Sequence, residues 1–297
     1  MQKTKPTRIT HTEWFFLCDN ICMLNVIVGV AARIVSNSWL NIFQKKLTLI
    51  GVRPSVVNFH TYLGLSLPSI ILIPNCYVGF SSELAFNTLV MGLLGALGNY
   101  YIVKSLSYGE VSSIAPINSY KPVVALLLGF FYLKEIPSVS ALLGIILIIA
   151  GTYFIYSSKN NVNAKAILYR VLALIFSGTE AIFIKKVILL SNITFAFVLW
   201  SIAGLAAASL FIIKYRHFLK PVSIKYQLCL ILSVAIMQYT TNYVFSKINV
   251  SYALALFQLS TLLSVYLGVN IFHEKGLRRK ILASVVMIIG AAIIIIF

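Results

Sequence analysis

Residues 111–155 read VSSIAPINSYKPVVALLLGFFYLKEIPSVSALLGIILIIAGTYFI, and residues 250–294 read VSYALALFQLSTLLSVYLGVNIFHEKGLRRKILASVVMIIGAAII. The two stretches align without gaps, each residue with the one 139 positions later. Self-similarity at a fixed offset predicts an internal repeat. The landmarks shared by the two stretches are Gly129 with Gly268, Glu135 with Glu274, and Gly151 with Gly290, and the basic doublets Lys45-Lys46 and Lys185-Lys186 extend the repeat upstream.

The composition requires lipid as the solvent for most of the chain. Of the 297 residues, 60% are hydrophobic and only 10% are charged, whereas a soluble domain is roughly 25% charged. A soluble fold of this size could not hide so much apolar surface from water. The sequence therefore predicts an integral, multi-pass membrane protein, which we expect in the cytoplasmic (inner) membrane of a prokaryote.

Apolar stretches long enough to cross a membrane recur along the chain. A hydrocarbon core about 30 Å thick needs roughly 20 residues of helix. Short polar joints separate the stretches, so we predict an all-α membrane protein with ten transmembrane helices. The predicted spans are 26–45, 57–76, 84–104, 111–133, 138–157, 166–187, 193–213, 227–246, 249–272 and 279–297.

The segment before the first span is harder to assign. Asp19 and Asn20 interrupt the short apolar run that begins at Trp14. We predict that residues 1–25 form an N-terminal interfacial segment, with aromatic side chains at the level of the lipid headgroups. An eleventh span is the alternative.

The predicted helices divide into two repeats of five, residues 26–157 and 164–297. Five is an odd number, so the second repeat begins on the opposite side of the membrane and runs inverted. Inverted repeats are a common architecture of secondary transporters, in which the substrate site lies near the midplane between the halves.

The residues of the repeat resemble a known family. Val111-Ser112-Ser113, Lys121-Pro122-Val123-Val124, Phe130-Phe131-Tyr132-Leu133-Lys134-Glu135, and Gly144 with Gly151 are similar to the fourth and fifth helices of an EamA domain. This domain belongs to the drug/metabolite transporter (DMT) superfamily. The second copy is similar, although Lys134 and His273 stand where the family commonly has Gly, and Thr261 aligns with Pro122. The resemblance implies a ten-helix carrier with a central cavity that exchanges or exports metabolites such as amino acids.

Charged residues inside the predicted hydrocarbon region reduce to Arg33, Lys121 and Glu180. Each costs roughly 2.5–3.5 kcal/mol at mid-span, so each should face a cavity or a partner. One hypothesis is that Lys121, with Arg33, binds a carboxylate or phosphate of the substrate, while Glu180 binds an ammonium group or carries a coupling proton. The alternative is an ion pair of Glu180 with Lys121 or Arg33 that only joins helices.

Polar and aromatic residues in the spans form a second group of candidate substrate-binding residues. The pairs Asn99-Tyr100 and Gln238-Tyr239 stand 139 positions apart, so each half is expected to present an amide and a ring to one cavity. The alternative is hydrogen bonding between helices, worth about 0.6 kcal/mol each. The glycines of the third helix, Gly95 among them, are predicted to be close-packing surfaces. The remaining candidates are Asn37, Trp39 and Tyr120.

The function predicted from these features is secondary transport of a small polar metabolite, an amino acid or another anionic or zwitterionic solute. We expect alternating access driven by a gradient or by exchange. A flippase for a lipid-linked or amphiphilic substrate, including drug efflux, is the alternative, and a membrane receptor is the third class. The sequence has no HExxH, GxSxG or Walker motif, so we predict no enzyme, no catalytic residues and no cofactor. The cysteine spacing predicts no metal site.

The expected partners are a small-molecule substrate and membrane lipid. Nucleic acid is not expected despite the net charge of +17, because the basic residues are scattered between apolar blocks. A coupling proton or counter-substrate, and a homodimer, are left open. Lys and Arg residues are more numerous on the side opposite the termini, so the positive-inside rule places the termini outside. The family resemblance instead implies cytoplasmic termini.

Overall fold

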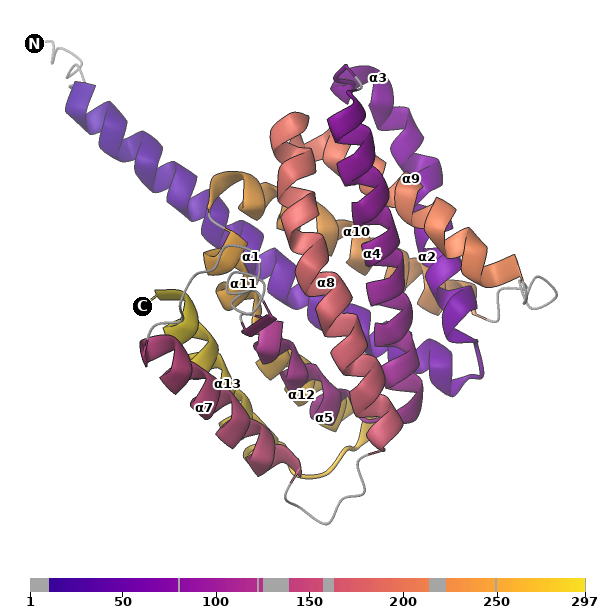
Figure 1. The fold of residues 1–297 in the computed structure, drawn as a ribbon, viewed down its shortest axis with the longest axis vertical. Helices are drawn as coiled ribbons and strands as arrows, with labels where there is room; N and C mark the ends of the chain where they lie inside the picture. Colours follow the sequence, from indigo (N-terminus) through magenta and orange to yellow (C-terminus); the bar gives the residue numbers. More distant parts are fainter. Residues whose placement is uncertain are drawn as a thin grey trace, which may run out of the picture.

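A computed structural model describes residues 11–79, 81–121, 123–124, 139–156, 163–213, 223–248 and 250–296, and these residues contain helices and no strand. Residues 1–10 and, within the predicted fourth span 111–133, residues 122 and 125–133 lie outside these ranges. The elements, drawn in Figure 1, are α1 (His11–Leu49), α2 (Pro54–Ser69), η1 (Ile70–Leu72), α3 (Ile73–Cys76), α4 (Ser82–Tyr108), α5 (Val111–Ile114), η2 (Ala115–Tyr120), α7 (Val139–Tyr156), α8 (Ala164–Leu190), α9 (Ile193–Ile212), α10 (Ile224–Lys247), α11 (Val250–Phe257), α12 (Ser260–Phe272) and α13 (Leu277–Ile296).

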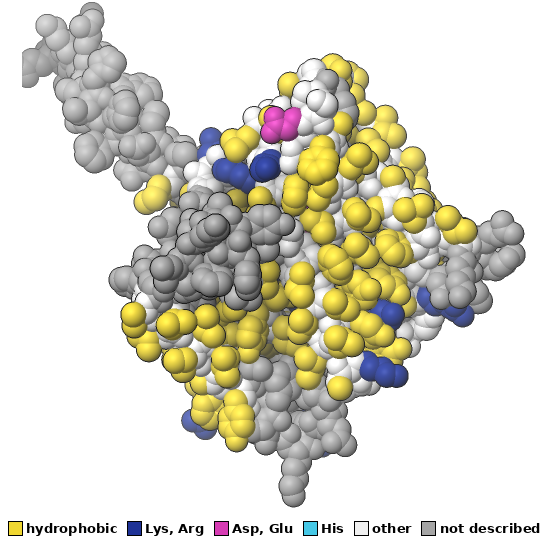
Figure 2. Space-filling view, viewed as in Figure 1, with side chains coloured by type: hydrophobic (Ala, Val, Ile, Leu, Met, Phe, Trp, Pro, Cys, Tyr) yellow, Lys and Arg dark blue, Asp and Glu magenta, His cyan; other side chains and the backbone are white. Residues whose placement is uncertain are grey.

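Seven helical segments of the described chain are long and apolar enough to cross a membrane. α7 adds a shorter apolar helix, Leu142–Gly151. Hydrophobic side chains cover the face shown in Figure 2, and Lys and Arg gather toward its upper and lower parts. The predicted all-α membrane fold is confirmed, while the number of ten spans stays a prediction. The seven segments are Met23–Leu49, Pro54–Cys76, Ser82–Tyr108, Ala164–Leu190, Ile193–Ile212, Ile224–Lys247 and Ala253–Phe272.

The helices begin where the sequence places residues that cap helix N-termini. Ser81, Asn163 and Asn192 each accept a hydrogen bond through the side chain from a backbone N–H in the first turn of α4, α8 and α9, respectively. Pro54 occupies the first turn of α2, where its missing N–H has no partner to lose. These caps satisfy N–H groups that the helix itself leaves free.

The N-terminal segment is continuous with the first span. α1 runs unbroken for 39 residues, from His11 to Leu49, and is about 58 Å long at 1.5 Å per residue. This is nearly twice the thickness of a hydrocarbon core of about 30 Å, and Figure 1 shows the first part of α1 extending away from the bundle. Residues 11–25 are therefore not a separate helix, and their place at the membrane interface stays a prediction.

Contacts between helices repeat in the two halves. α4 packs on α8 as its counterpart α10 packs on α1, and α4 packs on α9 as α10 packs on α2. α2 also contacts its own counterpart α9, and α7 contacts its counterpart α13. This pattern requires an approximate two-fold axis that exchanges the halves.

The direction of the paired counterparts shows that the halves are inverted. α2 and α9 run antiparallel. Tyr62 of α2 lies against Gly204 of α9, while Ser66, one turn later in α2, donates a hydrogen bond of 2.8 Å to the backbone oxygen of Ser201, which comes earlier in α9. Likewise Gly151 of α7 lies against Met287 of α13, whereas Gly290 lies against Gly144 O. Two-fold counterparts that run antiparallel place the axis in the membrane plane, so the predicted inverted repeat is confirmed.

The basic doublets of the repeat have one structural role in common. Lys45 Nζ donates to Leu106 O at 2.7 Å and to Gly109 O at 2.9 Å, at the end of α4. Lys185 Nζ donates to Phe245 O, near the end of α10. In each half this lysine therefore binds carbonyls at the C-terminal end of the third helix of its repeat, where a cation is favoured by the helix dipole.

Candidate functional site

A cavity of about 100 Å³ lies where helices of both halves meet. The first half contributes α1, α2 and α4, and the second contributes α8, α9, α10 and α11. Of the predicted site residues, Arg33, Asn37, Asn99, Glu180 and Gln238 line the cavity. The other lining residues are Leu40, Tyr62, Gly95, Ser177, Ala181, Ile184, Trp200, Val234, Met237, Thr241, Phe245, Leu254 and Phe257.

Arg33 forms the basic part of the cavity wall. Its side chain is buried, and its Cζ atom lies 4.3 Å from the centroid of the Phe257 ring on α11. Its Nε atom is buried and has no hydrogen-bond partner within the described residues. A guanidinium group stacked on a ring keeps donors free in its plane, so Arg33 is suited to bind an anionic group.

Glu180 forms the acidic part of the wall. Trp200 Nε1 on α9 donates a hydrogen bond of 2.7 Å to its Oε1 atom. Gly95 on α4 leaves room for this pair, because a Cβ there would lie 2.4 Å from Glu180 Oε1. The carboxylate is thus held by one neutral donor among aromatic side chains, and Tyr62 packs on Trp200 with ring centroids 5.0 Å apart.

The described residues contain no ion pair between Glu180 and either Arg33 or Lys121; the pair they contain joins Lys280 to Glu110. Lys121 directly follows η2 and interacts electrostatically with Arg33, Arg170 and Glu180, but it is not a lining residue. Arg33 and Glu180 thus line the same cavity without forming an ion pair in the described part of the chain. This arrangement leaves both signs of charge for a ligand.

The three amides on the wall are also hydrogen-bonded to other side chains, two of them between helices and one within its own helix. Asn37 Nδ2 donates to Ser260 Oγ at 3.0 Å. Asn99 accepts from Gln44 at 2.8 Å and donates to Asn58 at 2.6 Å. Gln238 Nε2 donates to Asn242 Oδ1 at 3.0 Å, one turn along α10. Interhelical bonding and contact with the cavity thus coexist in Asn37 and Asn99.

The structure does not bring the predicted aromatic residues to the cavity. Tyr100 stacks on Phe211 with centroids 5.7 Å apart, and Tyr239 is 41% exposed and packs edge-on against Phe197. Consecutive helix residues point about 100° apart, so only the amide of each amide–ring pair faces the cavity. The other two also lie elsewhere: Trp39 is 37% exposed and stacks on Phe43, and Tyr120 packs against the cluster of Ile148, Ala283, Met287 and Ala291.

The fourth helix of each repeat contains a 3₁₀ turn at equivalent positions. η2 ends at Ser119 and Tyr120, and the residues aligned with them, Gln258 and Leu259, separate α11 from α12 through the i→i−3 bonds of a 3₁₀ turn. Ser119 and Gln258 are buried, and Ser119 Oγ has no hydrogen-bond partner within the described residues. A 3₁₀ stretch inside a helix often marks a hinge, and interrupted helices at corresponding positions mark the substrate region of inverted-repeat carriers.

The lining residues that were not predicted include Tyr62, Trp200 and Phe257, which count as apolar in a span, and Gly95, which was assigned to packing. The sequence carries no feature that distinguishes Trp200 from a lipid-facing tryptophan, because its partner Glu180 is 20 residues away on another helix. Within the described part of the chain, no group of three His, Cys, Asp or Glu residues is placed to hold a metal ion.

Comparison with known proteins gives three findings. The profile of the EamA-like transporter family matches residues 25–157 and, a second time, residues 164–296. A protein named S-adenosylmethionine uptake transporter, from Rickettsia conorii (strain ATCC VR-613 / Malish 7), is 25% identical over 135 residues, which is 44% of this chain and 45% of that protein. This chain thus aligns with less than half the length of that relative.

The third finding concerns the fold. A crystal structure of another protein superimposes with a TM-score of 0.62 and covers 91% of this chain and 94% of the other. The sequences are 14% identical, so this likeness concerns the arrangement of the helices alone.

Proposed function

This chain belongs to the EamA-like transporter family of the DMT superfamily, and from this premise we propose that it moves a small zwitterionic metabolite through the central cavity by alternating access. As a multi-pass membrane protein of that family it is a transporter of small solutes. The proposal adds the substrate class and the mechanism. It also places the carrier in the inner membrane of a prokaryote, driven by a gradient or by exchange.

The separation of charge in the cavity carries the proposal. Arg33 on α1 offers an unpartnered buried Nε donor, and Glu180 on α8 has one oxygen bonded to Trp200, with no ion pair between the two charges in the described chain. Buried charges without partners are costly, and a ligand with a carboxylate and a cationic group supplies both missing partners. Lys121 adds positive charge nearby.

The size of the cavity supports alternating access as part of the proposal. At about 100 Å³, it is smaller than a typical small-molecule site of roughly 300–1,000 Å³. A substrate therefore requires the halves to move apart around it. S-adenosylmethionine is one candidate, because the bacterial relative is named for it and because it carries a carboxylate, an ammonium and a sulfonium group.

Counterflow in proteoliposomes tests the substrate class. Labelled S-adenosylmethionine, neutral amino acids, phosphorylated metabolites and amines would each be offered to the purified protein. Arg33→Gln and Glu180→Gln should each reduce counterflow of a zwitterion at least tenfold, because a hydrogen bond to a charged group is worth about 1.5–3 kcal/mol and about 1.4 kcal/mol is tenfold. Lys121→Met should reduce it less, since Lys121 does not line the cavity.

The matched controls are Arg278→Gln and Glu83→Gln, which remove the same charges at exposed positions outside the cavity, and these should transport as the parent does. If Arg33→Gln and Glu180→Gln also transport as the parent does, the substrate is not held by these charges. If no soluble class shows flux above protein-free vesicles, the flippase for an amphiphilic substrate, including drug efflux, becomes the better function.

A further inference from the structure

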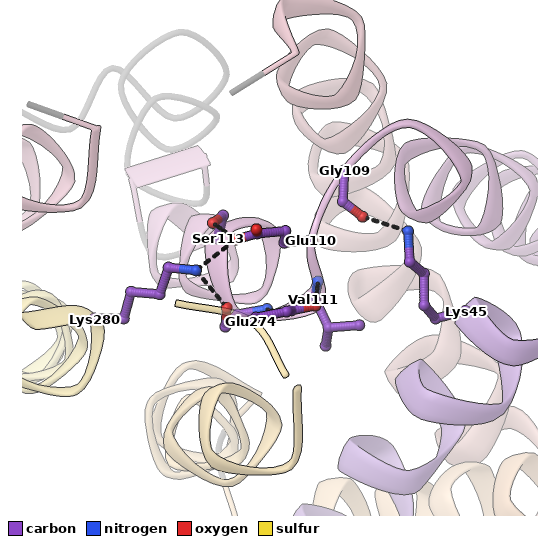
Figure 3. A network of polar contacts seen from close by, with 8 residues as sticks. Lys45, Gly109, Glu110, Val111, Ser113, Glu274 and Lys280 are labelled. Carbon is purple, nitrogen blue, oxygen red and sulfur yellow. Dashed lines mark hydrogen bonds and ion pairs between the residues drawn. The ribbon is translucent and has the colours of Figure 1, made fainter. Parts of the chain in front are cut away.

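Figure 3 shows a network of polar contacts that includes Lys45, Glu110, Glu274 and Lys280, none of which lines the central cavity. Glu274, which follows α12, accepts hydrogen bonds of 2.8 Å from the backbone N–H groups of both Val111 and Ser112 at the start of α5. The carboxylate thereby satisfies the free donors of a helix start. A Cβ on Gly268 would lie 2.9 Å from Glu274 Oε2, so the repeat's shared glycine makes room for its shared acid.

Lys280 on α13 forms the ion pair of this network. Its Nζ lies 2.6 Å from Glu110 Oε2 and 2.6 Å from Ser112 Oγ. The Lys280 side chain is only 6% exposed, whereas that of Glu110 is 46% exposed, and Ser113 Oγ donates a third hydrogen bond to Glu110 at 3.0 Å. Charge-assisted bonds of this kind are roughly twice as strong as neutral ones.

The network joins the two halves of the carrier. Glu110, Val111 and Ser112 belong to the first repeat, while Glu274 and Lys280 belong to the second. Beside it lies a pocket of about 380 Å³, bounded by Lys45 and Leu49 on α1 and by residues 272–275 of the α12–α13 turn. This pocket lies between the halves at the surface, and the ion pair borders it through Glu110.

The ion pair has no counterpart in the repeat. Glu110 aligns with Asn249, and Lys280 aligns with Ala141. Neither of these residues carries a charge, so they cannot form an ion pair. Glu274, in contrast, aligns with Glu135, and Val111-Ser112 align with Val250-Ser251. The two repeats therefore share this acid in the sequence, whereas the residues aligned with Glu110 and Lys280 are uncharged.

We propose that the Glu110–Lys280 ion pair is a latch that closes this end of the carrier and breaks when the end opens, so that the two access states differ in stability. The inference rests on the proposed alternating access. Opening separates α5 from α13 and lets water from the adjoining pocket reach the Lys280 ammonium. In the opposite state the other end closes without the equivalent of this ion pair, because Asn249 and Ala141 stand at the aligned positions.

Distance measurements between spin labels test the latch without depending on transport. Labels at Leu49→Cys and Lys275→Cys, in a background lacking the four native cysteines, stand on the two sides of the pocket and on different halves. The parent should populate mainly a short distance. Glu110→Gln and Lys280→Met should raise the ratio of long to short distances roughly tenfold, as the loss of a charge-assisted bond predicts.

Two further variants separate a latch from a general loss of charge or fold. The double variant Glu110→Lys with Lys280→Glu restores an ion pair and should return the distribution toward that of the parent. Lys165→Met removes an exposed lysine at the start of α8 that has no part in the network, and it should leave the distances unchanged. Because Glu110 is half exposed, Glu110→Gln keeps the test valid if Lys280→Met does not fold.

The outcomes distinguish this inference from the proposed function. If folded Glu110→Gln protein keeps the parent distribution, or if the charge-swapped protein resembles the single variants, the latch is wrong even where counterflow is intact. If the distances respond as expected but no solute is carried, the ion pair stands as the closing contact and the proposed function fails.

Discussion

At the scale of single residues, Gly95 decides how the Glu180 carboxylate is held. A Cβ at this position would lie 2.4 Å from Glu180 Oε1 and 3.1 Å from Trp200 Nε1, the two atoms of their hydrogen bond. The glycine was expected to serve helix packing, and it does bring α4 close to α8 and α9. Its second effect is to leave space for a buried carboxylate at the point where these helices meet.

Gly95→Ala should therefore disturb the candidate site while leaving the helices in place. Glu180 must move to avoid the methyl group, and the loss of its bond to Trp200 is worth about 1.5–3 kcal/mol. We expect counterflow to fall roughly tenfold at a limiting substrate concentration. Gly98→Ala is the matched control one turn along α4, because its Cβ would meet Ser177 at 3.4 Å, an ordinary contact. Equal transport by the two variants would show that the Glu180–Trp200 geometry is not needed.

Sequence reasoning found the charged residues of the site, because a charged side chain inside a membrane span has a high free-energy cost. Arg33 and Glu180 were singled out because a charge inside a span must have a reason, and both line the cavity. Tyr62, Trp200 and Phe257 cost nothing in a membrane, so nothing in the sequence marks them. The amide–ring pairs could not be resolved either, because whether Asn99 or Tyr100 faces inward depends on the rotation of α4, which packing sets.

At the scale of helices, the repeat is explained by what its shared residues do at helix ends and crossings. Lys45 and Lys185 each bind carbonyl groups at the C-terminal end of a third helix. Gly151 and Gly290 each lie at the contact of α7 with α13 and face the opposite helix. The lysines recur because each half needs the same closure of a helix end, and the glycines recur because each half supplies one helix to the contact between the halves, independently of the substrate.

Removing these lysine caps should cost stability more than the neighbouring lysines do. Lys45→Met and Lys185→Met each leave carbonyls of a helix end without their charged donor, and we expect each to destabilise the protein by about 1.5–3 kcal/mol. Lys46→Met and Lys186→Met are the matched controls in the same doublets. Lys46 Nζ lies 5.3 Å from the centroid of the Tyr226 ring, and Lys186 is exposed, so losses of at most about 1 kcal/mol are expected. Thermal unfolding in one detergent would compare the four variants, and equal losses within a doublet would contradict the capping role.

More of the helices than of the site could be predicted from the sequence, although not every helix boundary. Helix number and length follow from the thickness of the hydrocarbon core, which acts on each apolar stretch alone. The beginning of α1 could not be predicted, since Asp19 and Asn20 suggested an interruption where the helix continues from His11. The 3₁₀ stretch of η2 is likewise set by packing around Pro116 and Ser119, both buried, and not by local hydrophobicity.

At the scale of the whole molecule, inversion follows from two independent arguments. The odd number of spans predicted for each repeat reverses the second copy, and the antiparallel packing of α2 on α9 and of α7 on α13 requires a two-fold axis in the membrane plane. Because the repeats are inverted, the two ends of the molecule are built from equivalent residues of the two repeats. Under the proposed alternating access, differences between the halves such as the Glu110–Lys280 pair make the two access states unequal.

Inversion predicts that equivalent positions lie on opposite sides of the membrane. Leu49, at the end of α1, and Leu189, near the end of α8, are both exposed and stand 140 positions apart. In a background without the four native cysteines, a membrane-impermeant maleimide applied to intact cells should label one of Leu49→Cys and Leu189→Cys and not the other. Labelling of both from the same side would contradict the inverted arrangement. The labelled position also fixes the orientation: protection of Leu49→Cys supports the positive-inside rule, because the basic residues beside it (Lys45, Lys46 and Arg53) then face the cytoplasm and the start of α1 lies outside.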